Sequence, residues 1–192
     1  QEPNEVYATA ADLGYGTFLE YQKSLKSFLV LARLSYSANR SDINTLLQLI
    51  QEQYINYRFN ISSGYYQSYS VQLGIQFSYA LENGSLYTKA LIGYQRASMP
   101  EMELVYTDQT GFREVLNWAE SSANNPVFTM GVGLRRDLNA LFSLFLDVEF
   151  SYSKPSFVVE LNSDQGYREV SSLSRPMPIF FPSIGLGIRI PN

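Results

Sequence analysis

The sequence predicts an all-β protein: a closed antiparallel up-and-down transmembrane β-barrel of about eight strands, formed by one domain over residues 1–192. Two observations lead to this prediction. Apolar and polar residues alternate along most of the chain. The connections between these segments alternate between short and long. Because successive side chains of a β-strand point to opposite faces, alternation gives each strand one apolar and one polar face.

The clearest alternating segment runs from Phe142 to Tyr152. Its even positions hold Phe, Leu, Leu, Val, Phe and Tyr, whereas its odd positions hold Ser, Phe, Asp, Glu and Ser. With this segment included, we expect seven strands, at residues 10–22, 27–37, 55–81, 85–97, 127–136, 141–161 and 179–190. Each reaches the roughly 9–11 residues that a membrane-crossing strand needs. A barrel embedded in lipid has this apolar outside and polar inside.

The connections are short at residues 23–26, 82–84 and 137–140, and long at residues 38–53, 98–125 and 162–175. Outer-membrane barrels have short periplasmic turns and long extracellular loops. Asn83-Gly84 is a strong hairpin signal, because both central residues of such a turn need positive φ. In the first long connection, Ser41-Asp42 precedes apolar residues at helical spacing, which predicts a short amphipathic helix that packs on other loop residues or contacts a partner.

The position of the eighth strand stays open from the sequence. Residues 5–10 could form it, or the third segment could divide at Ser62-Ser63-Gly64. A partner chain could also supply a strand, or the strand count could be odd, although bacterial barrels have an even number as a rule. The first residues, Gln1-Glu2-Pro3-Asn4, fit either a secreted chain after removal of its signal peptide or an arbitrary boundary.

The inward parity of the alternating segments carries charged residues of both signs. Charges inside a narrow barrel need partners, so we expect a structural ion-pair network in the lumen. Its expected members are four acids and four bases: Asp12, Glu20, Asp147, Glu149, Arg33, Lys89, Arg135 and Arg189. The outward parity instead carries aromatic residues, with tyrosines near segment ends where interfacial girdles belong. The expected lipid-facing and girdle residues are Tyr15, Tyr21, Tyr36, Tyr79, Tyr94, Tyr152 and Phe180.

Composition excludes several kinds of chemistry. The chain has no cysteine and no histidine, which excludes disulfides, thiol chemistry and histidine-based general-base catalysis. Its net charge is −4 and it has no basic cluster, so a nucleic-acid partner is not indicated. An acid-only site at Asp147 and Glu149 is conceivable, but basic residues on the same inward face favour ion pairs. We therefore expect no enzymatic activity, no cofactor and no metal site.

Three stretches carry a resemblance to known proteins: Gly-Val-Gly-Leu-Arg-Arg-Asp-Leu at 131–138, the alternating segment at 144–153, and Gly-Leu-Gly-Ile-Arg-Ile at 185–190. They resemble small outer-membrane β-barrel proteins of the OmpA-transmembrane-domain and OmpX type, found in Gram-negative bacteria, Bacteroidota included. The resemblance implies a place in the outer membrane of a Gram-negative bacterium, in contact with its lipid and with other outer-membrane proteins.

Three functions are compatible with such a barrel. The favoured hypothesis is a structural or binding role through the extracellular loops. The second is an accessory subunit of a larger outer-membrane complex. The third, a narrow pore or a transporter of hydrophobic molecules, is disfavoured because side chains fill the interior of a barrel of about eight strands.

Overall fold

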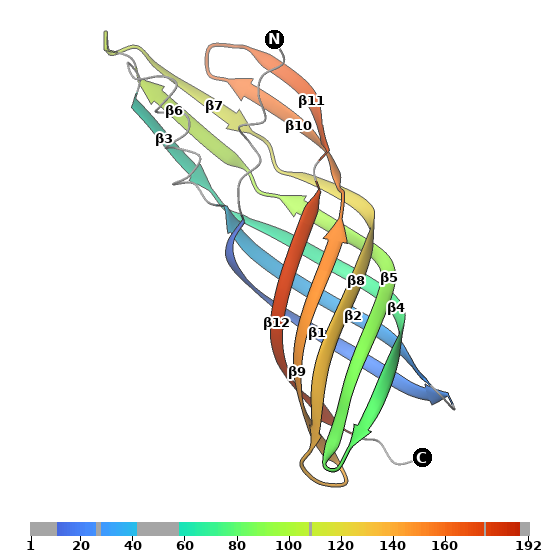
Figure 1. Cartoon of the computed structure of the whole chain (residues 1–192). Coiled ribbons are helices and arrows are strands. Elements are labelled where there is room, and N and C mark those ends of the chain that lie inside the picture. The colour runs from blue at the N-terminus through green and yellow to red at the C-terminus, as the bar shows by residue number, and fades with distance from the viewer. Residues whose placement is uncertain (1–10, 26–27, 42–57, 108, 175, 189–192) are drawn as a thin grey trace.

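The computed structural model describes residues 11–25, 28–41, 58–107, 109–174 and 176–188, which form two antiparallel β-sheets (Figure 1). The prediction of an all-β, antiparallel up-and-down fold is confirmed. The seven-stranded sheet has the order β1 (Ala11–Leu25), β2 (Phe28–Ser41), β4 (Tyr65–Leu81), β5 (Gly84–Met99), β8 (Ser121–Asp137), β9 (Phe142–Ser153) and β12 (Met177–Ile188). The five-stranded sheet has the order β11 (Arg168–Ser174), β10 (Ser156–Ser163), β7 (Arg113–Trp118), β6 (Met102–Thr107) and β3 (Arg58–Ser63).

The seven-stranded sheet curls into a half-barrel (Figure 1). Every neighbouring pair in it is antiparallel, so the first and last strands, β1 and β12, run in the same direction. Within the described ranges no ladder joins β1 to β12. Residues 5–10, one candidate for an eighth strand, lie outside the described residues. The other candidate, a division at Gly64, separates β3 from β4 but adds no strand to this sheet.

The five-stranded sheet extends from one end of the seven-stranded sheet (Figure 1). The expectation of long loops at 98–125 and 162–175 is wrong, because β6 pairs with β7 and β10 pairs with β11 in two hairpins. The chain passes between the wall and the five-stranded sheet at Gly64, Pro100, residues 119–120, Pro155 and Pro176. Proline and glycine are unfavourable inside a strand. They therefore interrupt the alternation of apolar and polar residues where they occur, although the chain continues in an extended conformation on either side.

The short connections differ in detail from the expected turns. β1 continues through Lys23 to Leu25, which lies opposite Phe28, so the short connection expected at 23–26 begins later than predicted. Leu81 pairs with Gly84, which places Glu82 and Asn83 in the loop in place of Asn83 and Gly84. A Cβ at Gly84 would lie 1.9 Å from the carbonyl oxygen of Arg135, so glycine is required there by the close approach of β8. The helix expected after Ser41 falls outside the described residues, and Ser41 itself ends β2.

A small apolar cluster lies where the two sheets meet. Its buried members come from β5, β8 and β10, and are Ala97, Met99, Ala123, Phe157 and Val159. Trp118 and Leu173 of the five-stranded sheet pack against it, together with Tyr66. Within the described residues, no helix has the length and apolar character required to cross a membrane.

Gly93 on β5 tests the close contact between neighbouring wall strands. A Cβ there would lie 1.9 Å from the carbonyl oxygen of Val71 on β4. Gly93→Ala should therefore force β4 and β5 apart and lower the free energy of unfolding by about 1–3 kcal/mol. Gly185→Ala is the control, because its nearest neighbour would be Phe145 Cβ at 3.9 Å. Urea denaturation followed by circular dichroism measures both changes, and equal losses would contradict the close approach.

Candidate functional site

Arg33 on β2 joins two strands that lie on opposite sides of the curled sheet. Its Nε lies 2.9 Å from Glu20 Oε2 on the neighbouring strand β1, where the two residues face each other in register. Its Nη2 lies 2.9 Å from Glu149 Oε1 on β9, which is four strands away in the sheet order. All three side chains are less than one-tenth exposed. The guanidinium therefore bridges the inside of the half-barrel.

Lys89 on β5 completes this buried cluster. Its Nζ lies 2.6 Å from Glu149 Oε1, 3.2 Å from Asp147 Oδ1 and 3.9 Å from Glu20 Oε2. The hydroxyl of Tyr87 donates a hydrogen bond to Asp147, and the Phe18 ring centroid lies 4.4 Å from the Arg33 guanidinium carbon. We call Glu20, Arg33, Lys89, Asp147 and Glu149 the central ion-pair network. Each of its charges faces an opposite charge, which suits a structural plug better than a catalytic group.

A glycine makes room for one side of this network. A Cβ at Gly133 would lie 2.3 Å from Asp147 Oδ1 and 2.5 Å from Tyr87 Cζ. At the turn end of β12, a Cβ at Gly187 would lie 2.3 Å from Phe145 Cε2. Both glycines belong to Gly-x-Gly pairs on the inward parity, where they admit the bulky side chains of neighbouring strands.

The structure brings together five of the eight residues expected in the lumen network. Arg135 lies apart, near the short turns, where its Nη2 is 2.8 Å from Asp137 Oδ1. Asp12 and Arg189 fall outside the residues whose side chains are described. Tyr87 has no expected role from the sequence, although it shares the inward parity of Lys89. That shared parity is the signal that could have identified it.

A band of neutral polar side chains lies next to the central ion-pair network. Ser35 and Ser70 hydroxyls are 2.6 Å apart, and Gln72 Nε2 donates to Thr129 Oγ1 at 2.9 Å. Beyond it the apolar cluster at the sheet junction begins. Along the inside of the half-barrel, ionic, neutral polar and apolar layers therefore follow one another towards the five-stranded sheet.

The outer face of the seven-stranded sheet has the reverse character. Its large apolar side chains are exposed; Leu19 is 73%, Ile92 66% and Ile184 70% accessible. The expected girdle and lipid-facing residues are likewise on this face, and all but Tyr36 are exposed: Tyr15, Tyr21, Tyr79, Tyr94, Tyr152 and Phe180. Tyr36 is half-buried between Tyr15 and Tyr69, with ring centroids 6.4 and 4.9 Å away.

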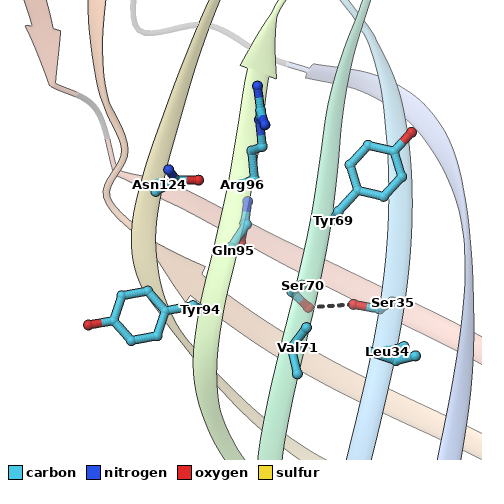
Figure 2. Close-up of a pocket in the computed structure, with 9 residues that line it drawn as sticks. All are labelled: Leu34, Ser35, Tyr69, Ser70, Val71, Tyr94, Gln95, Arg96 and Asn124. Atoms are coloured by element: carbon cyan, nitrogen blue, oxygen red, sulfur yellow. Dashed lines mark hydrogen bonds between the residues drawn. The ribbon is translucent and has the colours of Figure 1, made fainter.

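The outer face also has a shallow hollow of about 500 Å³ between β2, β4, β5 and β8 (Figure 2). Figure 2 shows Tyr69 and Tyr94 turned to opposite sides, with Arg96 and Asn124 next to each other on neighbouring strands. Leu34 and Val71 form its apolar part, and the intervening strand positions Ser35, Ser70 and Gln95 complete its lining.

Comparison of the chain with protein families, curated proteins and solved structures finds no match. Among the described residues, no three acidic side chains are grouped so that they could hold a metal ion.

Arg33→Met tests the central ion-pair network. It should lower the free energy of unfolding by about 3–5 kcal/mol, because it leaves Glu20 and Glu149 buried without their guanidinium partner. The matched control is Arg135→Met, whose pair with Asp137 is partly exposed and should contribute about 0–1 kcal/mol. Both are measured by urea denaturation. Similar losses for the two variants would show that Arg33 is no more important than a rim arginine.

Proposed function

We propose that this chain is a non-enzymatic β-barrel of the outer membrane of a Gram-negative bacterium, with a structural or binding role on the extracellular side. One observation supports this above all: the outer face of the curled sheet is apolar and exposed, while its inner face buries paired charges. A soluble barrel has the opposite polarity, because water stabilises polar side chains and apolar side chains fill the core.

The extent of the exposed apolar surface favours contact with lipid over contact with water. Exposed large apolar side chains occur on all seven strands of the curled sheet. Soluble monomers rarely expose apolar patches larger than a few hundred Å². In a bilayer the backbone polar groups must also be satisfied within the protein, and the continuous antiparallel ladders satisfy those between neighbouring strands.

The binding role belongs to the five-stranded sheet in this proposal. It extends from the end of the wall that carries Tyr36, Tyr69 and Tyr94. This end is opposite the short Glu82–Asn83 loop, and the five-stranded sheet would project outside the membrane (Figure 1). Its hairpins carry exposed polar side chains; for example, Arg168 Nε on β11 lies 3.0 Å from Glu160 Oε1 on β10. The pore hypothesis has less support, because the central ion-pair network and the apolar cluster both occupy the inside of the curled sheet.

A charge on the outer face distinguishes a lipid-embedded wall from a water-exposed one. Val132 on β8 and Val170 on β11 are similarly exposed, at 53% and 58%. After refolding into phosphatidylcholine vesicles, Val132→Arg should lower the free energy of unfolding by about 2–4 kcal/mol, as expected for arginine at mid-bilayer. Val170→Arg, outside the bilayer, should change it by no more than about 0.5 kcal/mol.

The measurement is urea unfolding, read by the difference in gel mobility between unheated and boiled samples. If both variants are as stable as the parent chain, or if the parent chain is monodisperse in buffer without detergent, the membrane proposal is wrong.

A second candidate function is that of an accessory subunit, and the two edges that no described strand pairs, β1 and β12, favour it. Since β1 and β12 run in the same direction, an antiparallel closing strand would have to run opposite to both. Closure of an eight-stranded barrel therefore needs a further strand, from this chain or from another. Unpaired edges are also where other chains add by strand pairing.

If the chain is a subunit, affinity purification from native membranes in a mild detergent should recover a second protein in stoichiometric amount. Light scattering should then give a protein mass well above the 21.8 kDa of this chain. A single species of about 21.8 kDa, with no second protein, would contradict the subunit role and favour a barrel that acts alone.

A further inference from the structure

The hollow on the outer face combines an apolar floor with one cation. Leu34, Val71 and Tyr94 lie opposite one another on β2, β4 and β5, and Tyr69, Arg96 and Asn124 form the next row. We propose that this hollow binds a phosphate-bearing anionic lipid, with the Arg96 guanidinium on the phosphate and an acyl chain along the apolar row. This inference depends on the proposed membrane location.

Arg96 is available for an external anion. Its side chain is exposed, and its Nη2 donates to Ser122 Oγ at 3.3 Å. Among the described residues it forms no salt bridge. A guanidinium has five donors in a planar fork that matches phosphate oxygens, so most of its hydrogen-bonding capacity remains unused.

The charges of the outer face support an anionic ligand. Within the described strands of the seven-stranded sheet, the charged side chains at exposed outward positions are all basic: Lys23, Arg40, Arg96 and Arg136. The acids of the same strands are on the inward parity, including Glu20, Asp147 and Glu149. A surface with unbalanced positive charge attracts anionic headgroups.

The position of Arg96 supports a lipid over a free anion. It lies directly opposite Tyr69, whose ring packs 4.9 Å from that of Tyr36, and Tyr94 is two positions before it on β5. Tyrosines of this kind lie at the level of lipid headgroups. Along β5, away from Arg96, the apolar surface continues from Tyr94 to Ile92, which is 66% exposed. A phosphate at Arg96 would thus have its acyl chain directed along an apolar surface.

The test uses native mass spectrometry of the folded full chain in detergent, titrated with phosphatidylglycerol or with zwitterionic phosphatidylcholine. The parent chain should retain one phosphatidylglycerol preferentially. Arg96→Gln should weaken its binding about tenfold or more, since hydrogen bonds to a charged group are lost. Arg96→Lys should retain part of the affinity. Arg136→Gln, an exposed outward arginine at the opposite end of the wall, is the matched control and should bind as the parent does.

Several outcomes would overturn the lipid site. Equal binding by Arg96→Gln and Arg136→Gln would do so, as would equal affinity for the two lipids. Complete displacement of phosphatidylglycerol by excess inorganic phosphate would show that the site recognises a free anion. The gel-mobility shift of each variant in phosphatidylcholine vesicles separates the two proposals. If the parent chain shows no shift, the membrane proposal fails; if it folds but binds without preference, only the lipid site fails.

Discussion

Arg33 reaches from one side of the half-barrel to the other, and the curvature of the sheet is tied to that contact. Glu20 is next to it in the ladder, but Glu149 comes close only because the sheet curls. Lys89 on β5 reaches the same carboxylate over Gly131, which lies between them in the ladders, and its Nζ also lies 3.9 Å from Glu20 Oε2 on β1. Flattening the sheet would separate Arg33 from Glu149 and Lys89 from Glu20, and so remove the ion pairs that reach across the half-barrel. The ion pairs therefore favour the curled sheet over a flatter one.

The same arrangement accounts for the opposite character of the two faces of the wall. Acids and bases of the wall are concentrated inside, where they form ion pairs with one another. The cations that remain outside lie towards the two ends of the strands, at positions such as Lys23, Arg96 and Arg136. Between them, the outer positions carry aliphatic and aromatic side chains such as Leu19, Ile92 and Val132. This separation by face and by height is what a bilayer with charged headgroups would select.

Much of the wall could be predicted from alternation alone, because a period of two determines which side chains share a face. Glu20, Arg33, Lys89, Asp147 and Glu149 could be assigned to the inward face in this way. Their mutual distances could not, since these depend on register and curvature, which no local pattern contains. Tyr87 was missed because an aromatic residue on a polar face gives no sign of its hydrogen-bond partner. The hairpin β6–β7 was missed because its residues are mixed in polarity. Most of β10 was expected as part of the strand at 141–161, and alternation could not show that the chain leaves the wall at Pro155.

The interruptions at Gly64, Pro100, Pro155 and Pro176 have a mechanical consequence. Pro100, Pro155 and Pro176 lie between strands, so the ladders of the wall end at the level where the chain passes into the five-stranded sheet. At that level side chains join the two sheets, because Ala97, Met99 and Ala123 of the wall pack with Phe157 and Val159 of β10. Truncating one of these side chains would therefore loosen the five-stranded sheet before it affects the ladders of the wall.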